Sequence, residues 1–389
     1  MVVIPSSDVW ARGTAPLLIF ILLVWVKRIF WMSRFRKTHP PLKPRDGFHA
    51  PFPKVSIVVP ARNEEKNIVN CLDHLTKQDY PNVEIIVVDD RSSDATAELL
   101  KKYDVKTIHI EKLPTAWTGK NYAMFTGSKA ASGEWLLFTD ADTTHSHSSV
   151  QTALACALEN GIDFLTLAPE TESKSFWEKT VQPLAVGSLA LWFNPEKVND
   201  SQSGIVLANG QFILIKKDVY EKVGGNESVK TEVVEDVALA KKVRTAGFTV
   251  KFLNGTLLYS TRMYSSLKEI NTGWTRIFTY LFEKKIFPIL HKIFLFLFFS
   301  CLPFLILSIE IFLKCWSSAD FSPALLGLSI VVCSWITLIR FIGNRLVRAN
   351  PWYAFLHLLG SLVMVGILFR CIGRIIFKKA SVWRGDYYP

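Results

Sequence analysis

The stretch Glu134-Trp135-Leu136-Leu137-Phe138-Thr139-Asp140-Ala141-Asp142 places two carboxylates directly after an apolar run. The run predicts a buried β-strand. Side chains two residues apart in extended backbone point the same way, so we expect Asp140 and Asp142 to converge just past the strand. Two anionic side chains at a strand end suit a hard divalent cation that is shared with the phosphates of a nucleotide. Taken alone, the pair also fits solvated carboxylates in a turn.

Strand-like and helix-like segments alternate around this stretch, from residue 55 to about residue 255. Near-continuous Val/Ile strands separated by amphipathic helices predict an α/β fold, with a mixed, mostly parallel, Rossmann-like sheet covered by helices on both faces. The predicted strands are 55–59, 83–88, 106–110, 135–138, 164–168, 212–215 and 248–253, and the clearest predicted helices are 67–76, 93–103 and 119–131.

Polar residues follow three of these strands at the point where each one ends. In open α/β sheets, ligands bind outside the carboxyl ends of the strands. This convergence favours a binding site over scattered turn carboxylates. The three segments are Pro60-Ala61-Arg62-Asn63-Glu64, Asp89-Asp90-Arg91-Ser92-Ser93-Asp94 and Asp140-Ala141-Asp142.

Apolar segments long enough to cross a membrane flank the predicted sheet on both sides. Trp10–Val26 is followed, not preceded, by Lys27-Arg28, which indicates an uncleaved anchor with the next domain on the cytoplasmic side. We therefore expect an anchor at 1–33, a basic, Pro-rich linker at 34–53 and the sheet domain at 54–260. Interfacial helices should follow at 261–292. The rest, 293–389, should form a membrane domain with about three spans, near 293–313, 321–339 and 351–369.

The composition supports an integral, multi-pass protein of the inner or plasma membrane. The chain has 389 residues, 49% of them hydrophobic, and a formal net charge of +11. Its basic residues cluster beside the apolar runs, which suits anionic lipid headgroups and argues against a nucleic-acid partner. Six cysteines without Cys-x-x-Cys spacing predict neither a disulfide framework nor a zinc site.

The side on which the chain ends is left open by the sequence. Three spans after a cytoplasmic domain put the C-terminus outside, whereas the basic tail after Phe369 favours the inside. A re-entrant run containing Pro303 or Pro351 would reconcile the two.

Four motifs together resemble the inverting family-2 glycosyltransferases of the GT-A fold. The order and spacing match across residues 55–250, and Trp117-Thr118-Gly119-Lys120 resembles a membrane-bound subgroup that includes the hopene-associated and carotenoid-acid glycosyltransferases, as does the ending 383–388. Ceramide glucosyltransferases are more distant relatives. The motifs are Val58–Glu64, Val88–Asp94, Thr139–Asp142 and Val234-Glu235-Asp236.

The resemblance implies a nucleotide-sugar donor, a UDP- or GDP-sugar. Asp89 and Asp90, with Glu64 nearby, would bind the donor nucleotide; an Asx-turn capping the next helix is the structural alternative. Asp94 is better suited to that capping role. Asp142, assisted by Asp140, would hold Mg²⁺ or Mn²⁺ against the diphosphate.

Two further positions are assigned near the donor. Lys120 follows a glycine at the start of a predicted helix, where a cation beside free N–H groups can reach phosphate oxygens; an ordinary exposed lysine is the alternative. The family pattern places catalytic acids at Glu235 and Asp236, with Asp236 as the base. Acids in a first helical turn can also merely complement the helix dipole.

Many processive and sphingolipid relatives carry a Gln-x-x-Arg-Trp signature after this point. This chain has Trp274 and Arg276 in a different order, and we assign them to the acceptor or the pyrophosphate at the membrane surface. His145 and His147 are candidates for late metal ligands or for a polar loop.

The sequence thus predicts a membrane-bound, metal-dependent glycosyltransferase that acts with inversion on a lipid or lipid-linked acceptor. A processive polysaccharide synthase and a non-catalytic membrane scaffold that keeps the fold are the alternatives.

Overall fold

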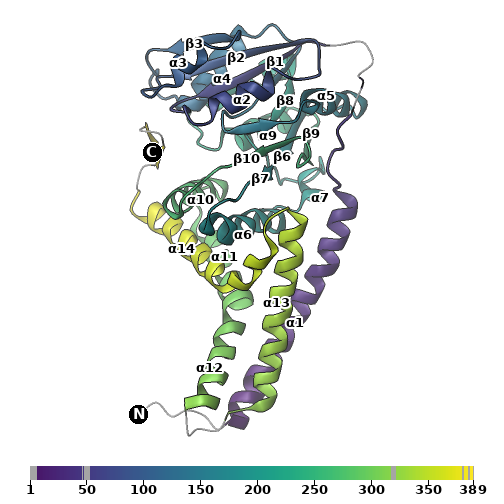
Figure 1. Cartoon of the computed structure of the whole chain (residues 1–389), viewed down its shortest axis with the longest axis vertical. Coiled ribbons are helices and arrows are strands. Elements are labelled where there is room, and N and C mark those ends of the chain that lie inside the picture. The colour runs from purple at the N-terminus through teal and green to yellow at the C-terminus, as the bar shows by residue number, and fades with distance from the viewer. Residues whose placement is uncertain are drawn as a thin grey trace. The chain divides into compact units, whose positions relative to one another are not determined.

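The computed structural model describes residues 7–45, 47, 53–316, 321–378, 381–383 and 386–388 (Figure 1). Two compact units are present. The sheet unit contains His39–Glu172 and Leu189–Met263, and the helical unit contains the chain up to Thr38, Ser173–Ser188 and Tyr264–Lys378. The segment predicted as one domain at 54–260 is therefore interrupted by residues 173–188.

The sheet unit is built on one seven-stranded sheet with the order β3-β2-β1-β4-β8-β6-β9. Strand β8 runs antiparallel to its neighbours β4 and β6, and the other pairs are parallel. The predicted mixed, mostly parallel sheet is confirmed. The strands are β1 Val55–Ala61, β2 Val83–Asp90, β3 Lys106–Ile110, β4 Trp135–Phe138, β6 Phe164–Ala168, β8 Ile213–Lys216 and β9 Val250–Asn254.

Helices cover both faces of this sheet. Alternate residues of β1 point to opposite faces, and Ile57 packs in one core with α2 (Ile68–Leu75) and α5 (Ser149–Glu159). On the other face, α4 (Gly119–Ala130) lies so close that a Cβ on Gly127 would come 3.1 Å from Val88 and closer still to Val58. The remaining helices are α3 Thr96–Leu100, α7 Pro195–Val198, α8 Lys217–Lys222, η1 Gly225–Val229 and α9 Glu235–Thr245.

A second sheet of three short strands, in the order β5-β10-β7, was not predicted. Its strands are β5 Thr143–His145, β7 Glu170–Thr171 and β10 Tyr259–Thr261. Segments of two or three residues are too short for an alternation of apolar and polar side chains to be recognised. Since β5 begins directly after Asp142, this sheet fixes one end of the loop that carries the acid pair.

Among the described residues, the helical unit contains four helices that are long and apolar enough to cross a membrane: Ala11–Thr38, Ile286–Trp316, Pro323–Leu346 and Pro351–Ile376. The first belongs to α1 (Ser7–Thr38), so residues 34–38 are helical and not part of a linker. The second begins at Ile286, so residues 286–292 are not a separate interfacial helix. It consists of α11 Ile286–Phe296, the π-helical turn η2 Leu297–Cys301 and α12 Leu302–Trp316.

Helix α13 (Pro323–Leu346) packs between α1 and α12 within this unit, whereas α14 (His357–Ile376) packs against α10 (Leu267–Leu281) and α11 (Figure 1). Two further helices complete the unit: the 3-10 helix η3 Pro351–Leu356 and most of α6, Phe176–Trp192. Near the end of the chain, β11 Ser381–Trp383 pairs with β12 Asp386–Tyr388.

Candidate active site

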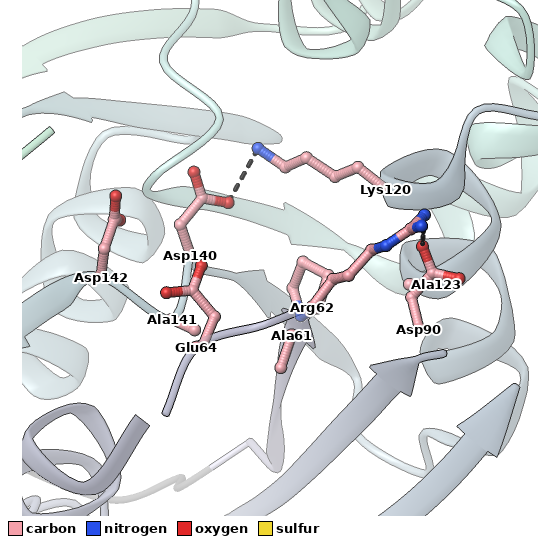
Figure 2. Close-up of a pocket in the computed structure, with 10 residues that line it drawn as sticks. Ala61, Arg62, Glu64, Asp90, Lys120, Ala123, Asp140, Ala141 and Asp142 are labelled. Atoms are coloured by element: carbon pink, nitrogen blue, oxygen red, sulfur yellow. Dashed lines mark ion pairs between the residues drawn. The ribbon is translucent and has the colours of Figure 1, made fainter. Parts of the chain in front are cut away.

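An open cavity lies at the carboxyl ends of β1, β2 and β4, with about 420 Å³ of empty space when the open solvent at its mouth is included. Strand β1 has β2 on one side and β4 on the other, so the order of the strands reverses here. Such a switch point is where open α/β sheets bind ligands. Figure 2 shows the lining side chains, and the cavity is lined by Pro60, Ala61, Arg62, Glu64, Asp90, Lys120, Ala123, Asp140, Ala141 and Asp142.

The acid pair reaches this cavity from a turn. Strand β4 ends at Phe138, and a turn at Ala141 and Asp142 follows Asp140, so the extended backbone we assumed for the pair is wrong. Both carboxylates still line the cavity, and both are half-buried. In Figure 2 they lie on the same side of the turn.

The two acids after β2 have different surroundings. Asp90 lines the cavity and forms ion pairs with Arg62, at 3.6 Å, and with Arg91, at 2.8 Å. Asp89 is not among the lining residues: one of its carboxylate oxygens accepts a hydrogen bond from the Ser92 backbone N–H, and the other lies 3.0 Å from His109 Nδ1. Of this predicted pair, only Asp90 faces the cavity.

Hydrogen bonds hold the loops after β1 and β2 together. The side-chain Oδ1 of Asn63 accepts from the Ser93 backbone N–H at 2.8 Å, and the Glu64 N–H donates to Thr96 Oγ1 at 2.8 Å. Asn63 has φ of 53°, a left-handed conformation that asparagine tolerates well. Asp94 accepts from the Thr96 backbone N–H at 3.0 Å, at the start of α3. These loops therefore present Glu64 and Asp90 on a fixed backbone.

Lys120 stands in the first turn of α4, whose N-cap is Thr118. Its Nζ lies 2.8 Å from Asp140 Oδ1 and 3.0 Å from Glu235 Oε1. Burial lowers the pKa of Lys120, but its attraction to Asp140 and Glu235 outweighs burial, and the pKa is raised overall. The lysine is thus a permanent cation at the cavity wall, between the acid pair and α9.

Asp236 is half-buried in the first turn of α9 and is held by backbone donors. Its Oδ2 accepts from the Gly210 N–H at 2.7 Å, and its Oδ1 accepts from its neighbour Val237 N–H at 2.8 Å. Burial, with the charge of Glu235, raises the pKa of Asp236 to about 7, although Lys120 opposes the shift. A carboxylate with such a pKa can take up a proton near neutral pH.

Two contributors to this arrangement were missed from the sequence. A Cβ on Gly210 would lie 3.0 Å from Lys120 Nζ and 3.2 Å from Glu235 Oε1, so the glycine leaves room for the charged groups. Asn121 is fully buried, and its Nδ2 donates to the backbone oxygens of Val229 and Glu232, which tie α4 to the segment before α9. Asn121 shares helical spacing with the buried Met124 and Ser128, and a polar side chain on that buried side of α4 was the available signal.

His145 lies in β5 and is 1% exposed. Its Nε2 hydrogen-bonds with the hydroxyls of Thr139, at 2.9 Å, and Thr143, at 3.1 Å, and its Nδ1 with that of Ser149, at 3.1 Å. Burial lowers the pKa of His145 to about 3, so the ring is neutral. Both ring nitrogens are engaged, which leaves neither for a metal, while His147 is exposed.

Trp274 and Arg276 both lie on the amphipathic helix α10 in the helical unit. Trp274 is 2% exposed, and its Nε1 donates to Gln182 Oε1 at 2.6 Å. The indole thus packs inside the helical unit, and Arg276 is half-buried.

The acid pair fits a divalent cation that is shared with a substrate. The described residues hold no group of three or more His, Cys, Asp or Glu side chains that could bind a metal ion. Mg²⁺ sites commonly use only one or two carboxylates and take their other ligands from phosphates and water. Asp140 and Asp142 supply that number at the wall of the cavity.

The fold and the cavity define a class of α/β domain that binds its ligand at the strand ends. Residues 56–224 match the family model for Glycosyl transferase family 2, so this part of the chain is a family 2 glycosyl transferase domain.

Curated relatives agree with this assignment. The chain is 27% identical over 229 residues to a 4,4'-diaponeurosporenoate glycosyltransferase of Staphylococcus aureus. This alignment covers 57% of this chain and 60% of the relative's length. It is 27% identical over 249 residues to the glycosyltransferase GlyG of Streptococcus pneumoniae, covering 60% of this chain and 79% of that protein.

A solved structure shares the fold. The mannosyltransferase PcManGT from Pyrobaculum calidifontis, solved in complex with GDP-Man and Mn²⁺, superposes with a TM-score of 0.51 at 16% identity. The superposition covers 94% of this chain and 99% of that one.

Proposed function

We propose that this protein is a membrane-bound glycosyltransferase that moves one sugar from a UDP- or GDP-sugar to a lipid or lipid-linked acceptor, with inversion and with the help of Mg²⁺ or Mn²⁺. One observation carries the proposal. In a family 2 domain, the acid pair and Lys120 stand together at the strand ends, and Lys120 is in turn paired with the Glu235-Asp236 segment.

The donor side of the cavity suits a nucleoside diphosphate. Asp90 and Glu64 can accept hydrogen bonds from a base imide or ribose hydroxyls, and Arg62 lies beside Asp90. Lys120 can exchange its contact with Asp140 for one with a phosphate oxygen, since both partners are anionic oxygens. Asp142 and Asp140 would hold the cation, which would neutralise charge on the leaving diphosphate.

Asp236 is the proposed base. Its carboxylate accepts the proton of the acceptor hydroxyl while that oxygen bonds to the anomeric carbon and the bond from this carbon to the diphosphate oxygen breaks. The Gly210 N–H fixes the carboxylate, and the pKa of about 7 allows it to gain and lose a proton at neutral pH. Glu235 contributes by holding Lys120.

The acceptor assignment is supported by the four apolar helices and by the name of the Staphylococcus relative, which specifies a carotenoid acid. The basic flank after the first apolar run supports a sheet unit on the cytoplasmic side of the inner or plasma membrane. Arg276, on the amphipathic helix α10, is the proposed contact for the acceptor headgroup, and Trp274 supports that helix from inside the unit.

Transfer assays in membranes test this proposal. Membranes containing the full chain are incubated with a panel of labelled UDP- and GDP-sugars, and the lipid fraction is analysed. We expect a labelled lipid that depends on Mg²⁺ or Mn²⁺ and disappears in Asp236→Asn and Asp142→Ala. Asp218→Asn, an exposed carboxylate in the same unit, should retain activity. Full activity in the first two variants would contradict the proposal, and absence of metal-dependent nucleotide binding would favour a scaffold.

A further inference from the structure

Arg340, on α13, is a buried cation inside the helical unit. It is 8% exposed, and one of its terminal nitrogens donates to the Thr180 backbone oxygen at 3.2 Å. Its Nε is buried without a hydrogen-bond partner. A guanidinium carries five N–H donors, so most of the donors of Arg340 are free for another acceptor.

Two more basic side chains lie on elements that pack against α13, the helix of Arg340: Arg28 on α1, and His357 directly after η3. Arg28 lies over the Trp25 ring at 4.2 Å, and the Trp25 and His357 rings meet at 5.8 Å. His357 is 2% exposed, and its Nδ1 has no hydrogen-bond partner. We call Arg28, Arg340 and His357 the basic cluster.

No carboxylate balances these groups. Within the described ranges, neither Arg28 nor Arg340 forms an ion pair with Asp or Glu. There, Arg340 has its hydrogen bond to Thr180, and Arg28 has its contact with the Trp25 ring. Burying a guanidinium without a counter-charge is strongly unfavourable, and a second arginine beside it adds repulsion. An anion bound among the three groups would remove both costs.

The cluster lies at the depth of lipid headgroups if α13 spans a membrane. Arg340 follows Pro323, the first residue of α13, by 17 positions, which is about 26 Å along a helix, close to the thickness of a hydrocarbon core. Arg345 lies in the last turn of the same helix, and Arg34 and Arg36 follow Arg28 on α1. Apart from Arg12 near the start of α1, both helices therefore carry their arginines toward their C-terminal ends, where headgroups are found if they span.

We propose that the basic cluster binds the anionic headgroup, a phosphate or carboxylate, of a lipid in the membrane interface. Planar guanidinium groups recognise both kinds of anion through paired N–H donors, and Nδ1 of His357, which has no hydrogen-bond partner, can add a further donor. The inference rests on the proposed placement of the helical unit in a membrane. It is independent of the chemistry assigned to the cavity in the sheet unit.

Lipid-dependent stability tests this inference directly. The full chain is reconstituted in nanodiscs of phosphatidylcholine alone or with phosphatidylglycerol, and Tm and retained lipid (by native mass spectrometry) are measured. We expect phosphatidylglycerol to raise Tm and to be retained by the wild type. Arg340→Gln should weaken this binding about tenfold, and Arg345→Gln, an exposed arginine five residues later, should not.

Further arms keep the test decisive. Arg28→Gln should reproduce the loss of lipid binding if Arg340→Gln does not fold. Three results would overturn the inference. The first is an equal Tm in both nanodiscs, and the second is wild-type lipid retention in the Arg28 and Arg340 variants. The third is an equal rise in Tm from soluble inorganic phosphate. A titration of Mn²⁺ and UDP or GDP should be unchanged in Arg340→Gln, so failure here is distinct from failure of the proposed function.

Activity distinguishes the source of the headgroup. If the cluster holds the acceptor, Arg340→Gln raises the KM for the acceptor and phosphatidylglycerol competes with it. If the cluster holds a resident phospholipid, that KM is unchanged, and wild-type activity rises with the phosphatidylglycerol content. Either result supports an anionic lipid site.

Discussion

Asp236 carries the proton in the proposed reaction, and its surroundings make that role sensitive to pH. Burial raises its pKa to about 7 from the ordinary value of 3.8. We expect kcat/KM of the wild type to rise with pH through about 7, and Asp236→Asn to lose at least ~100-fold in kcat. A pH profile that keeps its inflection in Asp236→Asn would contradict the assignment.

The same shift predicts how stability depends on pH. The folded protein binds this proton more tightly than the unfolded chain, so the stability that protonated Asp236 contributes is lost as pH rises from about 4 to about 7. In Asp236→Asn this dependence is absent. Between pH 5 and 8 we therefore expect the Tm of the wild type to fall relative to that of Asp236→Asn. Parallel Tm curves for the two proteins would show that Asp236 has an ordinary pKa.

Gly210 provides a test of geometry without a change of charge. An added Cβ would lie 3.0 Å from Lys120 Nζ, 3.2 Å from Glu235 Oε1 and 3.4 Å from Asp236 Oδ2, so the charged groups must shift by a few tenths of an ångström. We expect Gly210→Ala to reduce kcat on the order of 10- to 100-fold with little change in Tm. Gly204→Ala, where nothing lies within 4 Å, is the control. Equal kcat in both variants would remove Gly210 from the site.

The sequence predicts the acids and Lys120 but not their partners. Asp140, Asp142, Glu235 and Asp236 have spacings that carry a chemical meaning. Gly210 acts through a backbone N–H, which every residue type except proline possesses, so no pattern of side chains reveals this contact. Asp89 resembles Asp90 in sequence, and only tertiary contacts turn it toward His109.

At the level of elements, the short strand β5 links the acid-pair loop to the loop of Gly210. His145 hydrogen-bonds with Thr139, and the Thr139 hydroxyl donates to the Gln211 backbone oxygen at 2.8 Å. The neighbouring Gly210 N–H holds Asp236. One buried imidazole thus supports both loops, which makes it a positioning residue.

Substitution of His145 tests this linkage. His145→Ala removes the hydrogen bonds from the ring to Thr139, Thr143 and Ser149, each contributing about 0.5–1.5 kcal/mol, and loosens the Thr139 loop. We expect a lower Tm and a higher KM for both Mn²⁺ and the donor, with partial rescue of KM in His145→Gln. His147→Ala, an exposed histidine two residues on, should match the wild type. A lower Tm with unchanged KM values would mean that His145 only stabilises the fold.

The long elements follow from their hydrophobic pattern, and the short ones do not. Strands β3, β4 and β6 have the predicted bounds. Strands β4 and β6 are near-continuous apolar runs, and β3 places Ile108 and Ile110 at alternate positions. The helix expected at 93–103 is only Thr96–Leu100, because the hydrogen bonds of Asp94 and Ser93 hold the preceding residues in a loop. The pairing of β5 with β10 joins residues more than 100 positions apart, which no local pattern encodes.

At the scale of the whole chain, the packing of α14 bears on the side where the protein ends. Helices α1, α12 and α13 pack together, whereas α14 packs against the amphipathic α10 and against α11. If α14 remains in the interface, three helices span, and the C-terminus lies on the same side as the sheet unit. That arrangement agrees with the basic residues after Phe369.

Reporter fusions test this topology. We expect alkaline phosphatase to be active when fused after residue 316 and inactive after residues 345 and 389, with a cytoplasmic reporter showing the reverse pattern. An active phosphatase at residue 389 would mean that α14 crosses the membrane.

The central claim is that the cavity between β1, β2 and β4 binds a nucleoside diphosphate together with a divalent cation. Titration of the purified chain with UDP and GDP, with Mn²⁺ or with EDTA, measures this most directly. We predict that one nucleotide binds at least ~10-fold more tightly with Mn²⁺ and that Asp142→Asn abolishes the difference. The same Kd with and without Mn²⁺, or a wild-type Mn²⁺ dependence in Asp142→Asn, would contradict it.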